Sequence, residues 1–178
     1  MTNPTFTPAT PVDHRDALIA LNIEYVSWVA AEAETYFGIS TQESIGMTIA
    51  EYVPTVLDTI CGDPPPRGTF YLVERDSHLV GMGGLRWSNP GVAEIKRVYV
   101  RPAYRGAKLG AIILQRLLAD ARVFGYARVR LDTAPFMHAA HTLYEAAGFV
   151  DCAPYAGSEV PAFLHPKWRF MEKALRIQ

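Results

Sequence analysis

Apolar residues recur at helical spacing in four stretches of the chain, and short β-branched or aromatic runs lie between them. The helical spacing predicts helices over 13–37, 46–61, 109–124 and 137–147. The short runs predict strands over 69–74, 78–86, 93–100, 128–132, 149–152 and 168–175. We expect Asp13 and Gly38 to cap the first helix, and Pro54 to kink or break the second. Pattern alone therefore indicates an α/β protein with one mixed sheet.

Turn-forming residues separate the first three strands. Residues 75–77 are expected to form a hairpin turn, and 88–91 a second turn before the third strand. Gly81, Gly83 and Gly84 lie inside the second strand, where glycine has no side chain to pack. Their presence predicts a bulge or a close approach of another part of the chain.

The junction between the third strand and the third helix carries candidate chemistry. Gly106 and Gly110 allow a ligand to approach the backbone, and Arg105 and Lys108 supply positive charge. The first turn of the following helix has unpaired N–H groups and a partial positive charge. The junction is therefore suited to bind a phosphate group, and we call it the phosphate seat. Alternatively, it is an ordinary strand-to-helix turn with two solubilising charges.

Two motifs resemble those of the GNAT N-acetyltransferase family. The run Arg105-Gly106-Ala107-Lys108-Leu109-Gly110 resembles the family's acyl-CoA-binding motif, Arg/Gln-x-x-Gly-x-Gly/Ala. Lys108 departs from the motif's middle glycine, and we expect it to supply its N–H with a helical φ. The run from Leu143 to Phe149 resembles the family's Leu-Tyr-x-x-x-Gly-Phe helix end. The motifs follow each other in the family's order.

The resemblance implies a GNAT-like fold: a mixed, mostly antiparallel sheet flanked by helices, with central parallel strands that splay apart. It implies acetyl-CoA as the co-substrate, whose pantetheine arm pairs with the open edge of the third strand. The residues expected to bind it are Val98, Tyr99, Val100, Arg105, Gly106, Ala107, Lys108, Leu109 and Gly110.

The resemblance also suggests catalytic residues. Tyr144 occupies the position of the family's general acid, although it could instead be a core aromatic at the sheet edge. Glu94 is the favoured general base, because strict alternation places it on the strand face of Val98 and Val100. It could equally be a solvated glutamate at a strand end. Glu32, Glu34 and Asp132 are lesser candidates for the base, and Asp132 is expected instead to cap the turn that leads into the last helix.

Charge is distributed unevenly over a chain whose net charge is −1. Residues 1–66 hold nine acids and one base, a formal −8, and residues 67–178 hold sixteen bases and nine acids, a formal +7. Within one expected domain, 1–178, this suggests an acidic acceptor side and a basic cofactor side. It predicts a cationic small molecule or peptide as acceptor, contacted by Glu32 and Glu34. The alternative is two solvated faces.

Several function classes lack support in the sequence. The first residues do not resemble a signal peptide, and no apolar run is long enough to cross a membrane. Cys61 and Cys152 fit no metal or disulfide pattern, and His138 and His141 have no third ligand at a familiar spacing. No nucleic-acid-binding motif is present. We therefore expect a cytoplasmic protein without a metal, for which a homodimer is one option.

These observations predict an N-acetyltransferase that moves an acetyl group from acetyl-CoA directly to a primary amine. Direct transfer is expected because neither cysteine lies in a recognisable nucleophile setting. The alternative from another class is a catalytically idle acyl-CoA-binding sensor or interaction module.

Overall fold

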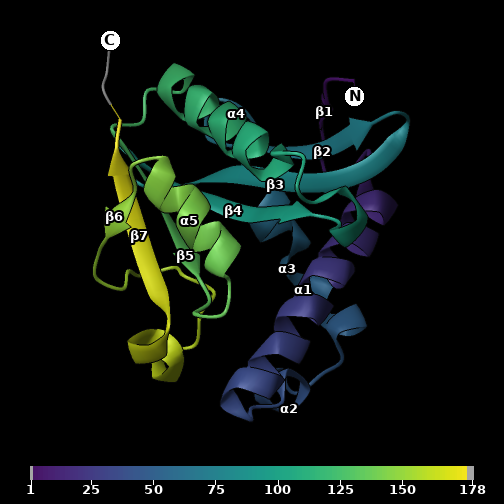
Figure 1. The fold of residues 1–178 in the computed structure, drawn as a ribbon, viewed down its shortest axis with the longest axis vertical. Coiled ribbons are helices and arrows are strands. Elements are labelled where there is room, and N and C mark those ends of the chain that lie inside the picture. The colour runs from purple at the N-terminus through teal and green to yellow at the C-terminus, as the bar shows by residue number, and fades with distance from the viewer. Residues whose placement is uncertain (1, 176–178) are drawn as a thin grey trace.

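The computed structural model describes residues 2–175, which build a seven-stranded mixed sheet with helices on both faces (Figure 1). Neighbouring strands are antiparallel except β4 and β5, which are parallel. In order across the sheet, the strands are β1 (Thr5–Pro8), β2 (Thr69–Arg75), β3 (His78–Asn89), β4 (Val92–Val100), β5 (Arg128–Thr133), β7 (Arg169–Ala174) and β6 (Val150–Asp151). The mixed, mostly antiparallel sheet confirms the expected fold class.

The helices form two layers, one on each face of the sheet. Helices α4 (Leu109–Val123) and α5 (His138–Ala146) cover the face that is nearer the viewer in Figure 1, and α3 (Ile49–Cys61) lies behind it. Helix α1 (Arg15–Phe37) packs on α3, and the short α2 (Thr41–Ile45) follows α1. Two short 3-10 helices, η1 (Pro102–Tyr104) and η2 (Ala162–Lys167), lie in the connections.

The two layers enclose separate apolar cores. Helix α4 contributes six buried side chains that recur every three or four residues, as an amphipathic helix requires. They are Leu109, Ile113, Leu114, Leu117, Leu118 and Ala121. Burial of each large aliphatic side chain contributes about 1.5–3 kcal/mol. On the other face, Leu18 and Leu21 of α1 and Leu57 of α3 pack against Phe70 and Met82 of the sheet. These cores fix both helical layers relative to β4.

The central parallel strands separate after a short paired stretch. Only Val92, Ala93 and Glu94 of β4 pair with β5, opposite residues 128–130. Beyond Glu94 the two strands diverge, so the β5-facing edge of β4 lacks a strand partner from Ile95 to Val100. The expected splay is therefore present.

A bulge interrupts β4 where the strands diverge. The register with β3 shifts between the pair Met82–Tyr99 and the pair Gly84–Lys96, and Arg97 has a positive φ of 56°. An extra residue of this kind changes which side chains share a face. Glu94 therefore does not share the face of Val98 and Val100, contrary to our expectation. Val98 and Val100 pack with the α4 core, while Tyr99 belongs to the core beside α1.

The predicted close approach at the β3 glycines is confirmed. A Cβ atom on Gly83 would lie 2.6 Å from Cγ2 of Ile113 in α4. One on Gly84 would lie 2.3 Å from the ring of Phe70. These two glycines allow a helix and a neighbouring ring to pack directly onto the strand, which positions the N-terminus of α4 beside β4.

Four sequence expectations need correction. β1 was not expected: residues 5–8 form a short strand at the sheet edge, opposite Tyr71–Glu74 of β2. The predicted helix 46–61 begins later, at Ile49: Gly46 adopts φ 71° and ends the unpredicted helix α2, and Thr48 is the N-cap of α3, with a capping box. Pro54 lies within α3 and does not end it. The turn after β3 consists only of Pro90 and Gly91.

The first helix also begins differently from our expectation. Its N-cap residue is His14, whose side chain makes no capping hydrogen bond, and the carboxylate of Asp13 accepts a bond from the Thr10 hydroxyl (2.8 Å). The expected cap at the other end is present, because Gly38 adopts φ 68° and its N–H donates to the carbonyl of Glu34.

Candidate functional site

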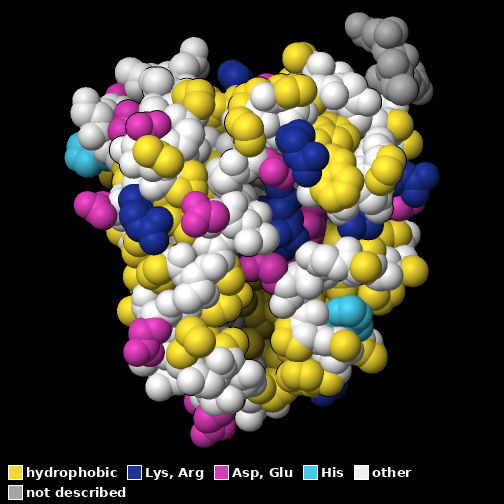
Figure 2. Space-filling view, turned by 180° about the vertical axis from the view of Figure 1, so that it is seen from behind, with side chains coloured by type: hydrophobic (Ala, Val, Ile, Leu, Met, Phe, Trp, Pro, Cys, Tyr) yellow, Lys and Arg dark blue, Asp and Glu magenta, His cyan; other side chains and the backbone are white. Residues whose placement is uncertain are grey.

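A cavity of about 810 Å³ lies where β4 and β5 separate. Its lining comes from α1, the bulged part of β4, the N-terminus of α4, helix α5 and the segment around η2. Seen from behind, the molecule is hollowed below a group of charged side chains, and hydrophobic side chains line the hollow (Figure 2). One cavity thus connects the predicted phosphate seat with the predicted catalytic tyrosine.

The phosphate end of the cavity is the turn before α4. Arg105, Gly106, Lys108, Leu109 and Gly110 line the cavity there, whereas Ala107 does not. The first N–H groups of α4 have no preceding helical carbonyl to bind and carry partial positive charge. Two exposed cationic residues add to that charge. These features suit an anionic ligand.

Lys108 takes an unexpected backbone conformation. It is the N-cap of α4 with φ 57° and ψ 14°, in the left-handed region rather than the helical region that we expected. A side chain in this region costs about 1–2 kcal/mol relative to glycine. The position therefore retains the conformation that the motif's glycine would favour, although the residue is lysine.

Arg105 is held against α1 and β4. Its Nε donates to the carbonyl of Val100 (3.1 Å), and its guanidinium lies over the rings of Trp28 (5.2 Å) and Tyr99 (6.0 Å). Stacking of this type orients the planar guanidinium and restricts its motion. Arg105 therefore connects the phosphate end to the α1 wall.

The open edge of β4 forms the floor of the cavity. Val98, Tyr99 and Val100 all line it, in agreement with their predicted position. Because this edge has no neighbouring strand, its backbone groups can pair with an extended ligand as an added strand does.

Tyr144 brings α5 to the same place. Its side chain lines the cavity and is only 7% exposed, beside the ring of Phe149. Burial raises the pKa of the Tyr144 phenol, and the nearby phenol of Tyr25 and carboxylate of Asp132 raise it further. The phenol therefore stays protonated at neutral pH and can donate a proton.

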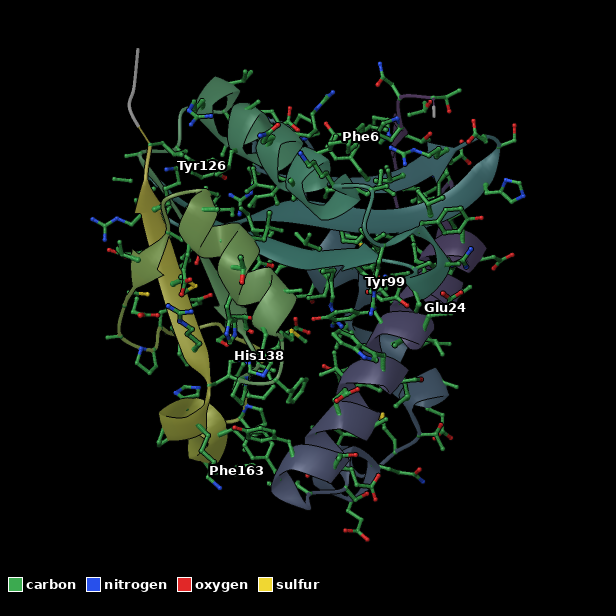
Figure 3. The ribbon with its side chains drawn as sticks, in the orientation of Figure 1. Phe6, Glu24, Tyr99, Tyr126, His138 and Phe163 are labelled. Atoms are coloured by element: carbon green, nitrogen blue, oxygen red, sulfur yellow. The ribbon has the colours of Figure 1, made fainter. Side chains whose placement is uncertain are left out.

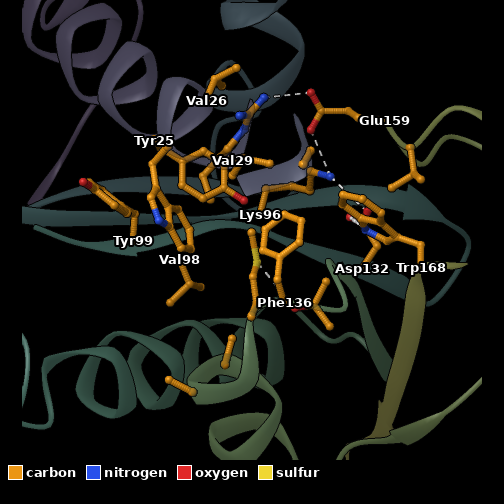
Figure 4. Close-up of a pocket in the computed structure, with 18 of the residues that line it drawn as sticks. Tyr25, Val26, Val29, Lys96, Val98, Tyr99, Asp132, Phe136, Glu159 and Trp168 are labelled. Carbon is orange, nitrogen blue, oxygen red and sulfur yellow. Dashed lines mark hydrogen bonds and ion pairs between the residues drawn. The ribbon is translucent and has the colours of Figure 1, made fainter. Parts of the chain in front are cut away.

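A cluster of ion pairs crosses the cavity beside the bulge. Lys96 Nζ lies 3.0 Å from Glu159 and 3.3 Å from Asp132, and Arg97 lies 2.8 Å from Glu159 (Figure 4). Burial alone would raise the pKa of Glu159, but Lys96 and Arg97 lower it to about 2. Burial likewise disfavours charged Lys96, yet Asp132, Glu159 and Glu94 together raise its pKa. Lys96 and Glu159 are therefore both charged at neutral pH.

Asp132 has a different role from the expected cap. It accepts hydrogen bonds from Ser158 (3.1 Å) and from the indole of Trp168 (3.3 Å), besides its contact with Lys96. The N-cap of α5 is Met137, which makes no side-chain capping bond. Asp132 instead joins β5 to the segment that closes the cavity.

Glu94 lies next to this cluster but not on the cavity surface. It is 1% exposed, pairs with Arg86 at 2.7 Å and accepts a hydrogen bond from the Tyr155 hydroxyl at 3.0 Å. The oxygen that accepts from Tyr155, Oε1, also lies 3.5 Å from Nζ of Lys96. Direct contact with an acceptor would require movement of these partners, so the role of Glu94 as a base stays a prediction.

Glu32 and Glu34 are not brought to the cavity. Both are exposed on α1, whereas the face of α1 that lines the cavity carries Tyr25, Trp28 and Phe37. Among the described residues, none of the acids of the segment up to residue 66 lines the cavity. The carboxylates that do, Asp132 and Glu159, come from the basic part of the chain and are already paired with cations.

The end of the cavity away from α4 is aromatic and aliphatic. The rings of Phe37, Phe136 and Trp168 lie with centroids 6.3–6.5 Å apart and come from three separate segments. Ile39, Val160 and Leu164 complete this part of the lining.

Sequence reasoning missed several lining residues because their meeting depends on long-range packing. Tyr25 and Tyr52 reach the cavity from α1 and α3, and Glu159 reaches it from the loop after β6. Burial raises the pKa of both phenols. The sequence did contain one signal of the bulge: Lys96 and Arg97 are two successive cationic residues in a largely apolar strand.

The remaining candidates contribute little to the site. His138 lines the cavity at the start of α5 (Figure 3), whereas the ring of His141 contacts the carbonyl of Ala134 (2.9 Å). Within residues 2–175, no group of three or more His, Cys, Asp or Glu side chains could hold a metal ion. The same part of the chain contains no helix that is long and apolar enough to cross a membrane.

Sequence comparison relates this chain to acetyltransferases. Residues 18–149 match the acetyltransferase (GNAT) family. An uncharacterised N-acetyltransferase of Schizosaccharomyces pombe is 36% identical over 100 residues, which are 54% of this chain and 61% of that protein. An IAA acetyltransferase of Azospirillum brasilense is 32% identical over 107 residues, which are 60% of this chain and 67% of that protein. The chain thus matches less than two thirds of the yeast relative's length.

Solved structures show the same fold over nearly the whole chain. A proposed acyl-CoA N-acyltransferase from Klebsiella pneumoniae superimposes with a TM-score of 0.67 at 28% identity, covering 97% of this chain and 98% of that one. The PaiA N-acetyltransferase of Thermoplasma acidophilum, solved with coenzyme A, gives 0.65 at 19% identity, covering 98% and 100%. With the family match over most of its length, the chain belongs to the GNAT family of acetyltransferases.

Proposed function

We propose that this protein is an acyl-CoA-dependent N-acetyltransferase that acetylates a primary amine by direct transfer. One observation supports this most strongly: the turn before α4, the open edge of β4 and the phenol of Tyr144 all line a single cavity. A phosphate seat, a strand edge for an extended ligand and a proton donor are the parts that acyl transfer from a thioester needs. A binding module without catalytic activity would not require the proton donor.

Acetyl-CoA fits the residues present. The pyrophosphate would be held by the first N–H groups of α4, with Arg105 and Lys108 supplying charge. The pantetheine arm would pair with β4 at Val98–Val100, where the strand has no partner. Gly110 leaves space beside the helix, because an added Cβ would make only an ordinary contact, 3.5 Å from Leu143. When bound there, acetyl-CoA supplies the acyl group as a thioester.

Acyl transfer from a thioester to an amine requires a proton donor for the departing thiolate. The amine nitrogen forms a C–N bond to the acyl carbon, the C–S bond breaks, and the departing thiolate must gain a proton. A thiol has a pKa of about 8.5, well below that of a phenol at about 10, so a positioned phenol is a suitable but weak donor. Tyr144 is the phenol on α5 that lines the cavity, and its raised pKa keeps the proton available.

An ammonium must also lose a proton before it can attack, since an amine of this type has a pKa of about 10.4. We propose that Asp132, rather than Glu94, accepts that proton, because Asp132 lines the cavity and Glu94 does not. Glu159 is a poor candidate, since its pKa of about 2 makes it a weak base. In this assignment Glu94 positions Lys96.

A covalent acyl-enzyme has no good nucleophile in the described part of the site. Cys61 is buried away from the cavity, and burial raises the pKa of its thiol to about 12. Cys152 does not line the cavity either, and burial raises its pKa as well. Direct transfer in a complex with both substrates is therefore the simpler mechanism.

The relatives' names do not agree on an acceptor. One curated relative is an IAA acetyltransferase, and a fold neighbour with a TM-score of 0.58 is a spermidine N-acetyltransferase chimera containing Vibrio cholerae sequence, 19% identical over 97% of this chain and 96% of that chain. The acceptor must therefore be inferred from this cavity.

Thiol release from acetyl-CoA, followed with a panel of primary amines, tests the proposal. We expect amine-dependent release and an N-acetylated product detected by mass spectrometry. Tight coenzyme A binding with no transfer to any amine would favour the sensor or interaction module instead.

A further inference from the structure

We infer that the acceptor is an arylalkyl primary amine, with one amino group and an apolar ring-bearing body, rather than a polyamine or an amino acid. The inference rests on the proposed acetyltransferase function and names its substrate class. The rings of Phe37, Phe136 and Trp168 carry it, because they form the acceptor end of the cavity together with aliphatic side chains.

The position of the rings relative to the chemistry fixes where the acceptor body lies. Asp132 accepts a hydrogen bond from the Trp168 indole (3.3 Å), so the proposed base and the aromatic end are adjacent. Figure 4 shows Phe136 and Trp168 on either side of the Lys96–Asp132 contact, with Tyr25 and Val98 toward the other end of the pocket. An amine that reaches Asp132 with its nitrogen therefore places its substituent among these rings.

The geometry of the rings suits an aromatic guest. Phe37 and Trp168 lie nearly parallel, with an interplanar angle of 24° and centroids 6.4 Å apart. Phe136 presents an edge to Trp168, at 83° and 6.3 Å. Rings that pack in offset and edge-to-face arrangements gain energy beyond that of area burial. The ring of an aromatic ligand, as a fourth ring, can extend both arrangements.

Charge in this part of the cavity is already compensated. Both oxygens of Glu159 are engaged, one by Lys96 at 3.0 Å and one by Arg97 at 2.8 Å. Asp132 contacts one of the rings through the Trp168 indole and has one ammonium partner, Lys96. Among the described lining residues at this end, no further acid is present to bind a second or third ammonium of a polyamine.

An amino acid acceptor lacks a partner for its carboxylate in the same way. Lys96 and Arg97 are paired, and Arg105 and Lys108 lie at the phosphate end. Lys167 contacts the ring of Phe37 (5.4 Å) but does not line the cavity.

The rim extends the apolar surface outward. Tyr36 is 58% exposed and contacts the rings of Phe37 and Phe136, with centroids 4.9 and 5.9 Å away. Phe163, on η2, is 60% exposed and lines the cavity (Figure 3). Exposed rings at the opening of an apolar pocket are expected where the ligand that enters is itself apolar.

Isothermal titration of the coenzyme A complex with three amines tests this inference without requiring turnover. We expect 2-phenylethylamine to bind roughly 10- to 100-fold more tightly than ethylamine, from burial of its ring. Spermidine should bind no more tightly than ethylamine at 0.15 M salt, and raising the salt concentration should leave the Kd of phenylethylamine nearly unchanged.

Phe37→Leu and Phe136→Leu should each weaken phenylethylamine binding at least threefold and leave ethylamine binding unchanged. Phe124→Leu is the matched control, a half-buried phenylalanine at the C-terminus of α4, remote from this cavity. Tightest binding by spermidine, or full phenylethylamine affinity in both ring variants, would overturn the inference.

Thiol release measured in parallel separates the two proposals. Selective phenylethylamine binding without any transfer contradicts the proposed enzyme but supports the ligand class. Transfer that is fastest to spermidine or to an amino acid supports the enzyme and contradicts the ligand class.

Discussion

Glu159 Oε2 lies 3.0 Å from Nζ of Lys96, which joins the loop after β6 to the bulge of β4. The contact is partly buried, with the Glu159 side chain 25% exposed and that of Lys96 7% exposed. The loop and the strand are distant in sequence, and this ion pair, with the bond from Arg86 to the carbonyl of Gly157 (2.7 Å), holds the loop over the cavity. The position of the loop over the acceptor end of the cavity therefore depends on the ion pair between Glu159 and Lys96.

Replacement of Glu159 by Gln should make the protein less stable at pH 7. The folded pKa of about 2 lies below the ordinary 4.5, so Glu159 stabilises the fold above pH 4.5 and loses this contribution as the pH falls toward 2. The difference between these two pKa values corresponds to about 3 kcal/mol of lost stability, at about 1.4 kcal/mol for each pKa unit.

Thermal melts of wild type and Glu159→Gln between pH 7 and pH 3 measure this effect. We expect the difference in Tm to be largest at pH 7 and to shrink mostly by pH 3. Glu34→Gln, an exposed change on α1, is the control and should not alter Tm at either pH. A difference that stays constant over this range would mean that Glu159 does not stabilise as an anion.

Tyr144→Phe should lower kcat about 10²-fold or more, because it removes the proposed proton donor and keeps the ring. The dissociation constant for coenzyme A should change little. Tyr126→Phe is the control: its hydroxyl donates to the carbonyl of Arg67 (2.6 Å) and does not reach the cavity. A wild-type rate in Tyr144→Phe would show that Tyr144 is structural.

Gly110→Asp should weaken coenzyme A binding severely, because it places a negative charge in the first turn of α4, where the pyrophosphate is proposed to lie. The fold should tolerate the change, since a Cβ at Gly110 would contact only Leu143, at 3.5 Å. Gln115→Asp adds a similar charge on an exposed part of the same helix and should bind normally. Calorimetry with coenzyme A compares the two, and equal affinities would refute the phosphate seat.

Lys108→Gly and Lys108→Ala separate backbone strain from charge. Both remove the ammonium group, but only glycine accepts φ 57° without cost. Glycine should therefore be more stable than alanine by about 1 kcal/mol, measured by denaturant unfolding. The two variants should bind coenzyme A equally, more weakly than wild type. Greater stability of the alanine variant would contradict the left-handed conformation.

The base is tested by comparing Asp132→Asn with Glu94→Gln. We expect Asp132→Asn to lower kcat about 10²-fold, as loss of a general base does, and Glu94→Gln to lower it less than tenfold. Circular dichroism should confirm that Glu94→Gln folds, because the change leaves buried Arg86 without its partner. A larger kcat loss in Glu94→Gln would restore Glu94 as the base.

The sequence predicted those parts of the fold whose pattern is local. Helices α1, α4 and α5 and strands β2–β5 follow from periodicity, and the phosphate seat follows from the residues between 105 and 110. β1 escaped because it has only four residues and ends in proline, so its alternation of threonines with Phe6 and Pro8 is too short to predict a strand.

The bulge at Arg97 was not predicted from the sequence, and it changes which side chains of β4 face the site. Counting alternate residues from Glu94 fails beyond Lys96, because one extra residue reverses every later side chain. Glu32 and Glu34 lie outside the cavity for a different reason, which is the direction of their side chains on α1. The helix register of α1 places Trp28 and Phe37, not these carboxylates, toward the cavity. Total charge of a segment does not determine which of its faces carries that charge.

The separation of β4 from β5 also has a consequence for solubility. An unpaired strand edge on a protein surface is a template for pairing with another chain and promotes aggregation. Here the open edge from Ile95 to Val100 lies inside the molecule, between walls contributed by α1, α4 and α5. The protein can therefore keep backbone groups free for a small extended ligand while denying them to the strands of other proteins.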